Sequence, residues 1–187
     1  MHSLLKTEQI STNKKMNTKQ SNTHTTPSDI GAAYITYCRQ RLLKEYFPKI
    51  QRCLDDLSEN DIWWRAHETN NSIGNLILHL CGNIRQWIIS GIGGAQDVRN
   101  RPKEFSEREY IPKSALLTIL ESTLREADRT LEQFDLSKLL EVRHIQVYDV
   151  TCLYVISEVV EHFSHHLGQI IYITKLRTGK DLKFYNL

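Results

Sequence analysis

The fold class follows from one stretch of the sequence, VTCLYVISEVVEHFSHHLGQIIYITKLRT, which runs from Val150 to Thr178. Its apolar side chains, among them Val159, Phe163 and Leu167, recur every three or four residues, as they do on the buried face of a helix. Gly179 comes directly after the stretch, and glycine is a common residue at the end of a helix. We therefore predict one long helix from about Val150 to Thr178.

Three earlier blocks of the chain show the same helical spacing, and no segment alternates convincingly with the period of two that marks a strand. The blocks run over Ser28–Leu57, from Asn71 or Ser72 to the glycines Gly91, Gly93 and Gly94, and over Pro112–Phe134. Pro48 lies inside the first block and predicts a kink or a break near Phe47, because proline lacks the backbone N–H. Four such helices predict an all-α fold, a four-helix bundle.

Two segments lie outside this pattern. Residues 1–28 hold mostly Ser, Thr, Asn, Lys and Gln. Because they have too few apolar side chains to offset the entropy of ordering, we predict a disordered polar tail there and one bundle domain over residues 29–187. The connection from Gly94 to Pro112 is unusually long for a link between helices, which favours a functional or crossover role. We expect it to cover one end of the bundle.

The long connection is also charged. Its charged residues include Asp97, Arg99, Arg101 and Glu104. They could bind an anionic substrate, but mutual salt bridges on the surface are the stronger prediction.

The composition excludes several function classes. The chain has 187 residues with 24 Lys plus Arg against 22 Asp plus Glu, and it lacks the basic stripe of a nucleic-acid-binding protein. Its apolar runs fall far short of the ~20 residues of a membrane span. The four cysteines form no CxxC pair, and the first thirty residues lack the apolar core of a secretory signal. We therefore expect a cytoplasmic protein with reduced thiols and without a nucleic-acid or membrane partner.

The long C-terminal helix carries the first candidate site residues, His162 and His166. At ~100° per residue they lie about 40° apart and one turn along, so both imidazoles can reach one ion. They share a stripe with Glu158 that we expect to face the interior, whereas His165 falls nearer the solvent side. A His-x-x-x-His pair alone often arises by chance, and its members are more often packing or surface residues than metal ligands.

A third histidine, His79, lies in the second helical block on a stripe that is polar but carries no Lys or Glu. Exposed helix faces are normally rich in those residues, so we predict that this stripe faces the interior. Its other polar members are Ser72, Asn75, Asn83 and Gln86. Buried polar side chains need partners, which a metal ion or a hydrogen-bonded network with water would supply. Three imidazoles that leave one position open are a known arrangement in catalytic zinc sites.

Glu158 and Gln169 are weaker candidates near the same site. Glu158 precedes His162 by one turn, so it is a candidate fourth ligand, an outer partner that orients an imidazole, or a proton shuttle. A carboxylate in an ordinary ion pair is the alternative interpretation. Gln169 has a similar but weaker claim.

Several well-known catalytic motifs are absent from the sequence. His162 is followed by Phe163, so the His-Glu-x-x-His motif of zincin proteases does not occur. The repeated Glu-x-x-His motif of di-iron bundles is missing as well. The chain also lacks a Gly-x-Ser-x-Gly elbow and a phosphate-binding glycine loop.

Several groups of residues, taken in their order along the chain, resemble the DinB/YfiT-like family of four-helix bundles. The matching residues are Pro48–Ile50 with Cys53 and Leu54, Asp61–Trp64, Asn71–Leu80 with Gly82 and Asn83, Gly93–Gly94 through Asp97, Arg99, Arg101, Glu104 and Phe105, and His162–Gln169. The resemblance spans about residues 30–187. It implies that His79, His162 and His166 bind a divalent metal ion, often nickel or zinc. For activity it implies a transferase that uses a low-molecular-weight thiol, or a hydrolase, and it makes a homodimer plausible.

Three hypotheses for the function follow. The first is a metal-dependent enzyme acting on a small molecule by hydrolysis or thiol transfer, because a divalent ion held by neutral imidazoles lowers the pKa of a bound water or thiol. The second is a non-catalytic bundle or dimer in which the histidines, or a metal bound to them, only hold the helices together. The third is a metal sensor or carrier. They differ in whether an ion is bound, whether it exchanges, and whether a substrate turns over.

Overall fold

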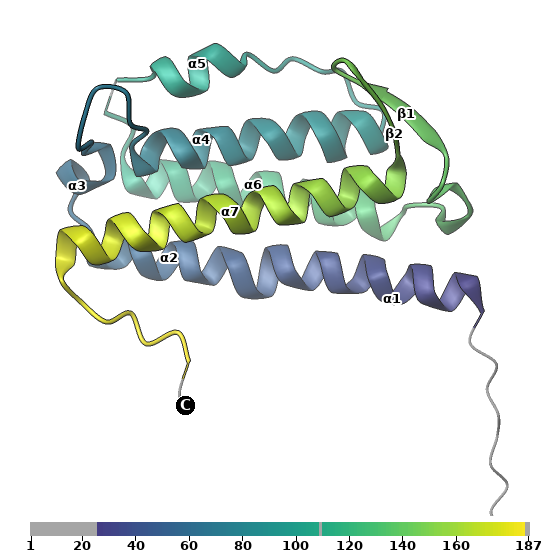
Figure 1. Cartoon of the computed structure of the whole chain (residues 1–187), viewed down its shortest axis with the longest axis horizontal. Helices are drawn as coiled ribbons and strands as arrows, with labels where there is room; N and C mark the ends of the chain where they lie inside the picture. The colour runs from purple at the N-terminus through teal and green to yellow at the C-terminus, as the bar shows by residue number, and fades with distance from the viewer. Residues whose placement is uncertain (1–25, 109, 186–187) are drawn as a thin grey trace, which may run out of the picture.

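Helices make up most of the described chain, which comprises residues 26–108 and 110–185 of this computed structural model (Figure 1). Four long helical segments carry the fold in this part of the chain. They are α1–η1–α2 (Pro27–Gln40, Arg41–Tyr46 and Phe47–Asp56), α4–η2 (Ile73–Ile84 and Arg85–Ile92), α6 (Lys113–Glu132) and α7 (Cys152–Thr178). The shorter pieces are α3 (Glu59–Trp63), α5 (Arg101–Ser106) and η3 (Leu136–Lys138). The stretches η1 and η2 are π-helical, and η3 is a 3₁₀ turn.

The first helical segment passes through Pro48 without a break. The N–H of Phe47 donates to the carbonyl of Leu42, five residues earlier, which gives the wide turn of a π-helix just before the proline. Because this wider turn accommodates the proline, the predicted break near Phe47 does not occur. The segment starts at Pro27, inside the predicted tail, and the first 25 residues of that tail lie outside the described residues.

The other three long helices lie close to where the sequence predicts them. α7 ends at Thr178, and Gly179 follows with a φ of 65°, a left-handed conformation that suits glycine. Ser72 caps α4, and α6 follows Pro112. Within the described chain, none of these helices combines the length and the apolarity needed to cross a membrane.

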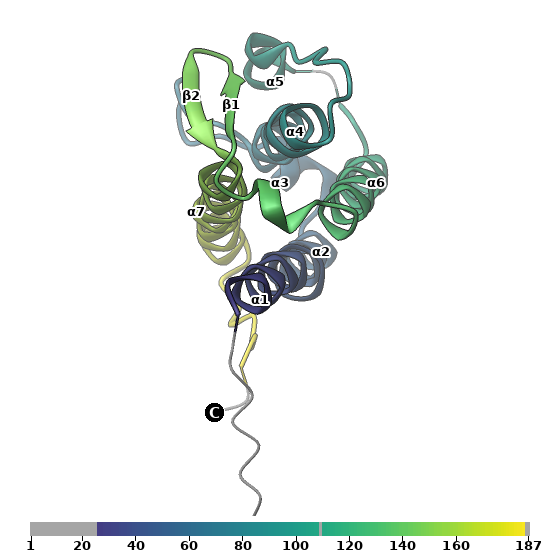
Figure 2. The same ribbon diagram turned by 90° about the vertical axis from the view of Figure 1, so that its right-hand side faces the viewer.

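The four long segments run side by side around a shared apolar core (Figure 2). α4 packs against α6 and α7, and the α1–α2 segment packs against the same two helices from the other side. Fully buried members of this core include Ile50, Leu54, Ile77, Leu120 and Phe163. Each helix contributes one apolar stripe, and removing these stripes from water is the main source of stability.

The long connection between α4 and α6 is a crossover. α6 runs in the same direction as α4, so the chain returns along the molecule between them (Figure 1). α5 lies in this connection and packs along the outer side of α4, where the ring centroid of Phe105 is 4.6 Å from that of His79. The prediction that the connection covers one end of the bundle is therefore wrong, because it covers the flank of α4 that carries His79.

A short β-hairpin after α6 corrects the prediction of a purely helical chain. β1 (Val142–Ile145) pairs antiparallel with β2 (Tyr148–Thr151). Ile145 is the buried side chain of the hairpin, so the alternation of apolar and polar residues is too weak to mark a strand in the sequence. The hairpin packs beside η2, where the rings of Tyr148 and Trp87 have centroids 6.2 Å apart.

The four cysteines are all free and buried. Cys81 lies on α4 two residues after His79, and burial raises the pKa of its thiol to about 12. A buried, protonated thiol is a poor nucleophile and a poor metal ligand. Cys81 belongs to the apolar core.

Candidate metal centre

His79 reaches the interior because of where α4 begins. Ser72 and Asn75 form a reciprocal capping box, in which the Ser72 hydroxyl accepts from the Asn75 N–H and the Asn75 side chain accepts from the Ser72 N–H. This fixes the first turn, and His79 follows one turn after Asn75 with only 5% of its surface exposed. Asn83, one turn further along, is also buried. The predicted interior stripe is therefore confirmed as far as Asn83, whereas Gln86 is only half-buried.

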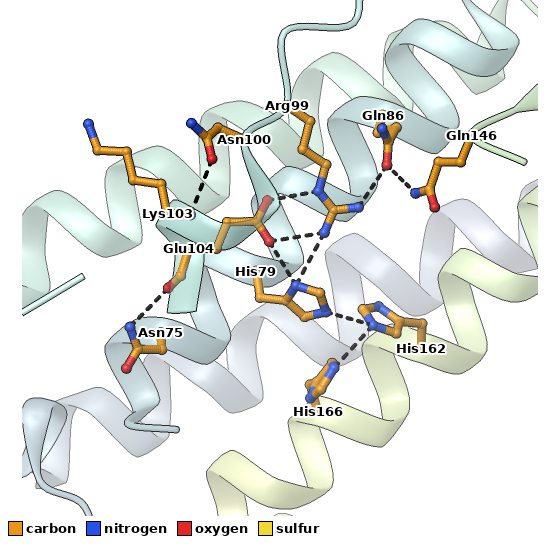
Figure 3. A network of polar contacts seen from close by, with 10 residues as sticks. All are labelled: Asn75, His79, Gln86, Arg99, Asn100, Lys103, Glu104, Gln146, His162 and His166. Carbon is orange, nitrogen blue, oxygen red and sulfur yellow. Dashed lines mark hydrogen bonds and ion pairs between the residues drawn. The ribbon is translucent and has the colours of Figure 1, made fainter. Parts of the chain in front are cut away.

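α7 places His162 and His166 one turn apart on the side that faces His79 (Figure 3). Both are partly buried, whereas His165 is exposed, as predicted. Phe163 and Leu167 belong to the apolar core and hold the same part of α7 against the other helices.

The three predicted histidines meet at one point. Nε2 of His162 is 3.0 Å from Nε2 of His79 and 3.1 Å from Nε2 of His166. One nitrogen from each ring lies within 4.8 Å of the other two. A tetrahedral zinc ion with bonds of about 2.0–2.1 Å spaces its ligand atoms about 3.3 Å apart, so small adjustments bring the three nitrogens onto one ion. The cluster can therefore hold a metal ion.

The outer nitrogens of two rings are already hydrogen-bonded. Nδ1 of His79 donates to Oε2 of Glu104 at 2.8 Å, and Nδ1 of His166 donates to Oε1 of Gln169 at 2.8 Å. The amide nitrogen of Gln169 donates in turn to Nε2 of His165 at 3.1 Å, which orients the amide. These acceptors keep the ring protons on Nδ1, so the Nε2 lone pairs of His79 and His166 face inward.

His162 is the ring without such a partner. Its Nδ1 is buried and makes no hydrogen bond within the described chain. With its proton on Nδ1, three Nε2 lone pairs face one another, and with its proton on Nε2, Nδ1 is a buried acceptor without a donor. Either tautomer leaves polar atoms unsatisfied. A cation among the three Nε2 atoms would remove the repulsion between their lone pairs.

Burial favours the neutral forms of His162 and His166. Removal from water, followed by the nearby positive groups, lowers the pKa of His162 to about 3. Burial also lowers the pKa of His166, although its hydrogen bond with Gln169 opposes the shift. The neutral imidazole is the form that binds metal ions.

Our sequence reasoning missed Glu104 and Arg99 as site residues. We expected both to form salt bridges on the surface, but their side chains are only 9% and 4% exposed. Nε of Arg99 is 2.8 Å from Oε1 of Glu104, and Nη2 is 3.0 Å from Oε2, so the ion pair is two-pronged. Burial raises the pKa of Glu104, but the hydrogen bonds from His79 and Arg99 outweigh it and bring the pKa below its usual value. An ionised carboxylate therefore faces His79.

Gly82 is the sequence signal that could have revealed this contact. It lies three residues after His79, on the same face of α4. A Cβ at this position would lie 1.9 Å from Oε1 of Glu104. Glycine is thus needed here, because any side chain would push the carboxylate away from His79.

The polar network continues from Arg99 to the hairpin (Figure 3). Nη1 of Arg99 donates to Oε1 of Gln86 at 2.9 Å, and Gln86 also contacts Gln146 at the hairpin turn. Gln146 has a φ of 58°, which is uncommon for a residue with a side chain. Asp97 and Arg101, which the sequence places in the same connection as Arg99 and Glu104, are exposed as expected.

Glu158 lies on α7 one turn before His162 and is half-buried. It makes no hydrogen bond or ion pair with another residue of the described chain. Its carboxylate is thus not engaged elsewhere, and its role stays a prediction.

The comparisons with known proteins give a family without an activity. The sequence model of a family described as "Protein of unknown function (DUF1572)" matches residues 29–187. Among curated proteins, none matches this chain. The chemistry of the site has to be argued from its own residues.

Proposed function

Since the chain belongs to the DUF1572 family of proteins of unknown function, we propose a function from the site itself: a metal-dependent enzyme that acts on a small molecule. His79, His162 and His166 are the proposed ligands of a divalent ion. The observation that carries the proposal is the convergence of three Nε2 atoms, two of them from rings whose Nδ1 atoms are already hydrogen-bonded. Three protein ligands suit a catalytic site, because structural zinc sites normally use four.

The proposed ion is zinc or nickel. Imidazole nitrogens suit zinc, nickel, copper and iron alike, so the ligand set alone does not choose among them. The resemblance to the DinB/YfiT-like family implies zinc or nickel. The same resemblance implies the four-helix bundle of that family, which the side-by-side packing of the long helical segments supports.

The proposed reaction is a hydrolysis or a transfer of a low-molecular-weight thiol. The ion, when bound, supplies Lewis acidity that lowers the pKa of a water or a thiol. Glu104, which Arg99 holds in place, orients the ring of His79, and Gln169 orients that of His166. Glu158 is our candidate for the proton shuttle, because it lies one turn from His162 and has no partner within the described chain.

We also propose where the enzyme acts and what it binds. From the composition we propose a cytoplasmic protein whose partner is a small-molecule substrate, with neither nucleic acid nor a membrane involved. From the DinB/YfiT-like resemblance we also propose that the protein forms a homodimer.

Elemental analysis of the purified, tag-free chain tests the metal site. We expect about one divalent ion per wild-type chain and none in the His162→Ala, His166→Ala double variant. His144→Ala is the control, since it removes an exposed imidazole from the hairpin, and it should keep the ion. A wild type without metal, even after reconstitution with zinc or nickel, would refute the proposal.

A screen of the metal-loaded protein separates an enzyme from a bundle with a structural ion. We expect turnover of an ester, or of a thiol with an electrophile, that disappears in the double variant. An ion that only raises the melting temperature, with no turnover of either substrate class, would favour the non-catalytic bundle. Rapid metal exchange coupled to a conformational change would instead favour a sensor or carrier.

A further inference from the structure

A groove of about 570 Å³ adjoins the histidine cluster. It lies between the loop of residues 64–71, the start of α4 and the middle of α7, and its size is typical of a small-molecule site. Its lining includes Arg65, Leu76, His165, Gln169, Tyr172 and Leu176.

Arg65 lines the groove, and no salt bridge within the described residues pairs its positive charge with a carboxylate. Its Nη2 donates to Oδ1 of Asn75 at 3.2 Å and to the backbone carbonyl of Glu107 at 3.4 Å, and both acceptors are uncharged. Its Nε is buried and has no hydrogen-bond partner within the described chain. Nearby Arg108 adds to the positive potential, and burial together with that charge lowers the pKa of Arg65.

The lining itself contains no acidic residue. Glu68 is the acidic neighbour whose charge acts on Arg65, but it does not line the groove and no salt bridge joins the two within the described residues. Charged groups that are removed from water are normally paired with an opposite charge, and Arg65 is partly buried. The unpaired charge of Arg65 therefore favours a ligand that brings its own anion, and a planar guanidinium suits a carboxylate.

Large apolar side chains line another part of the groove. Tyr172 is 69% exposed and Leu176 is 58% exposed, and both lie toward the C-terminal end of α7. Leu76 of α4 lines the groove as well. A ligand that stacks an apolar body on these residues while its carboxylate meets Arg65 would satisfy both parts of the groove.

Gln169 joins the groove to the histidines. It lines the groove, and its Oε1 accepts from Nδ1 of His166 at 2.8 Å. His165 also lines the groove, and the centroid of its ring is 5.1 Å from that of His166. A molecule in the groove is thus close to His166, one of the three proposed ligands.

We propose that this groove is the binding site for the substrate of the proposed enzyme, and that the substrate is a small carboxylate with an apolar body whose anion is bound by Arg65. That this ligand is a substrate rests on the proposed function. The binding itself depends only on the groove.

Calorimetric titration of the zinc-loaded full chain with 3-phenylpropanoate and with its neutral amide tests the ligand class. We expect the carboxylate to bind about tenfold or more tightly than the amide, since a charge-assisted hydrogen bond is lost with the charge. Arg65→Gln should abolish this preference, and Arg65→Lys should keep part of it. Arg125→Gln is the control, because it removes an exposed arginine of α6 that pairs with Glu121. Equal affinity for the carboxylate and the amide would overturn the proposal.

Gly168→Leu provides a second variant that does not touch the interactions of Arg65. Gly168 lines the groove on α7, and a Cβ at this position would meet no atom within 4 Å. The leucine should therefore fill the groove without disturbing the helix. We expect it to weaken binding of the carboxylate about tenfold or more. Unchanged binding in this folded variant would overturn the proposal.

The same titration shows whether the proposed groove or the proposed metal centre is wrong. Carboxylate binding that persists in the His162→Ala, His166→Ala variant and is lost in Arg65→Gln supports the groove, even if the wild type holds no metal. Carboxylate binding that needs zinc and survives Arg65→Gln shows that the anion binds to the ion. That result overturns the groove and leaves the proposed metal centre intact.

Discussion

Glu104 is the residue that most clearly separates a prepared metal centre from three histidines that merely lie close together. It accepts the Nδ1 proton of His79, and Arg99 holds it in place through a two-pronged ion pair. An ionised acceptor behind a metal-binding imidazole fixes its tautomer and raises its basicity. A histidine in an ordinary core has no need of such an arrangement.

Glu104→Gln tests whether the charge of Glu104 supports metal binding by His79. The amide still fits the space but removes the charge behind His79, so we expect zinc affinity to fall roughly 10- to 100-fold while the fold is kept. Competition with a chromophoric chelator measures the affinity. Glu126→Gln, which changes an exposed carboxylate paired with Arg85, should leave it unchanged.

Gly82→Ala should have the same effect as Glu104→Gln through sterics alone. Its Cβ would occupy the place of Oε1 of Glu104, so the carboxylate has to move away from His79. Zinc affinity that is unchanged in both variants would show that Glu104 does not support a metal ligand.

At the scale of the element, two glycines in helices that carry the site should respond oppositely to alanine. A Cβ at Gly168 of α7 meets open space, whereas a Cβ at Gly74 of α4 would lie 2.7 Å from the ring of Trp63. Alanine is favoured over glycine in a helix by about 1 kcal/mol. We therefore expect Gly168→Ala to raise the free energy of unfolding in urea by roughly 0.5–1 kcal/mol and Gly74→Ala to lower it. Equal effects at the two positions would contradict the packing described here.

The helices that carry the histidines could be predicted from the sequence, but the residues that contact the outer side of His79 could not. α7 starts two residues after the predicted Val150 and ends at the predicted Thr178. The positions of His162 and His166 follow from that periodicity, because a helix fixes which side chains share a face.

The contacts of Glu104 depend on tertiary structure. Charged residues in a connection are normally exposed, and only the packing of α5 along α4 buries Glu104. The hairpin was missed for a related reason, since its strands are short and mostly exposed and so carry little apolar pattern. Gly82 was a usable signal, because a small residue on the face of His79 leaves room for a side chain from elsewhere.

At the scale of the whole molecule, an ion pair between Asp61 of α3 and Arg177 of α7 ties the first half of the described chain to its last helix, with N and O 2.7 Å apart. The Ser58 hydroxyl, which donates to Asp61, lowers the pKa of Asp61 most; burial opposes this, and Arg177 lowers the pKa further. The folded pKa therefore lies below the value of about 3.9 in the unfolded chain.

This shift predicts a pH dependence of stability. As the pH falls, the unfolded chain binds the proton first, so the contribution of Asp61 is complete above about pH 5 and is lost as the pH falls through 4 toward the folded pKa. Asp61→Asn should lower the free energy of unfolding by roughly 0.5–1 kcal/mol at pH 7, and the difference from the wild type should shrink by pH 3. Urea unfolding between pH 3 and 7 measures this. Asp55→Asn, at an exposed position of α2, should show no such trend, and an equal pH trend in both variants would contradict the account.

Anomalous diffraction at the zinc edge from crystals of the zinc-loaded chain would locate the ion itself. We expect one strong peak about 2.0–2.1 Å from Nε2 of His79, His162 and His166. No peak at these three nitrogens, or a peak only at exposed histidines such as His144 and His165, would contradict the proposed metal centre.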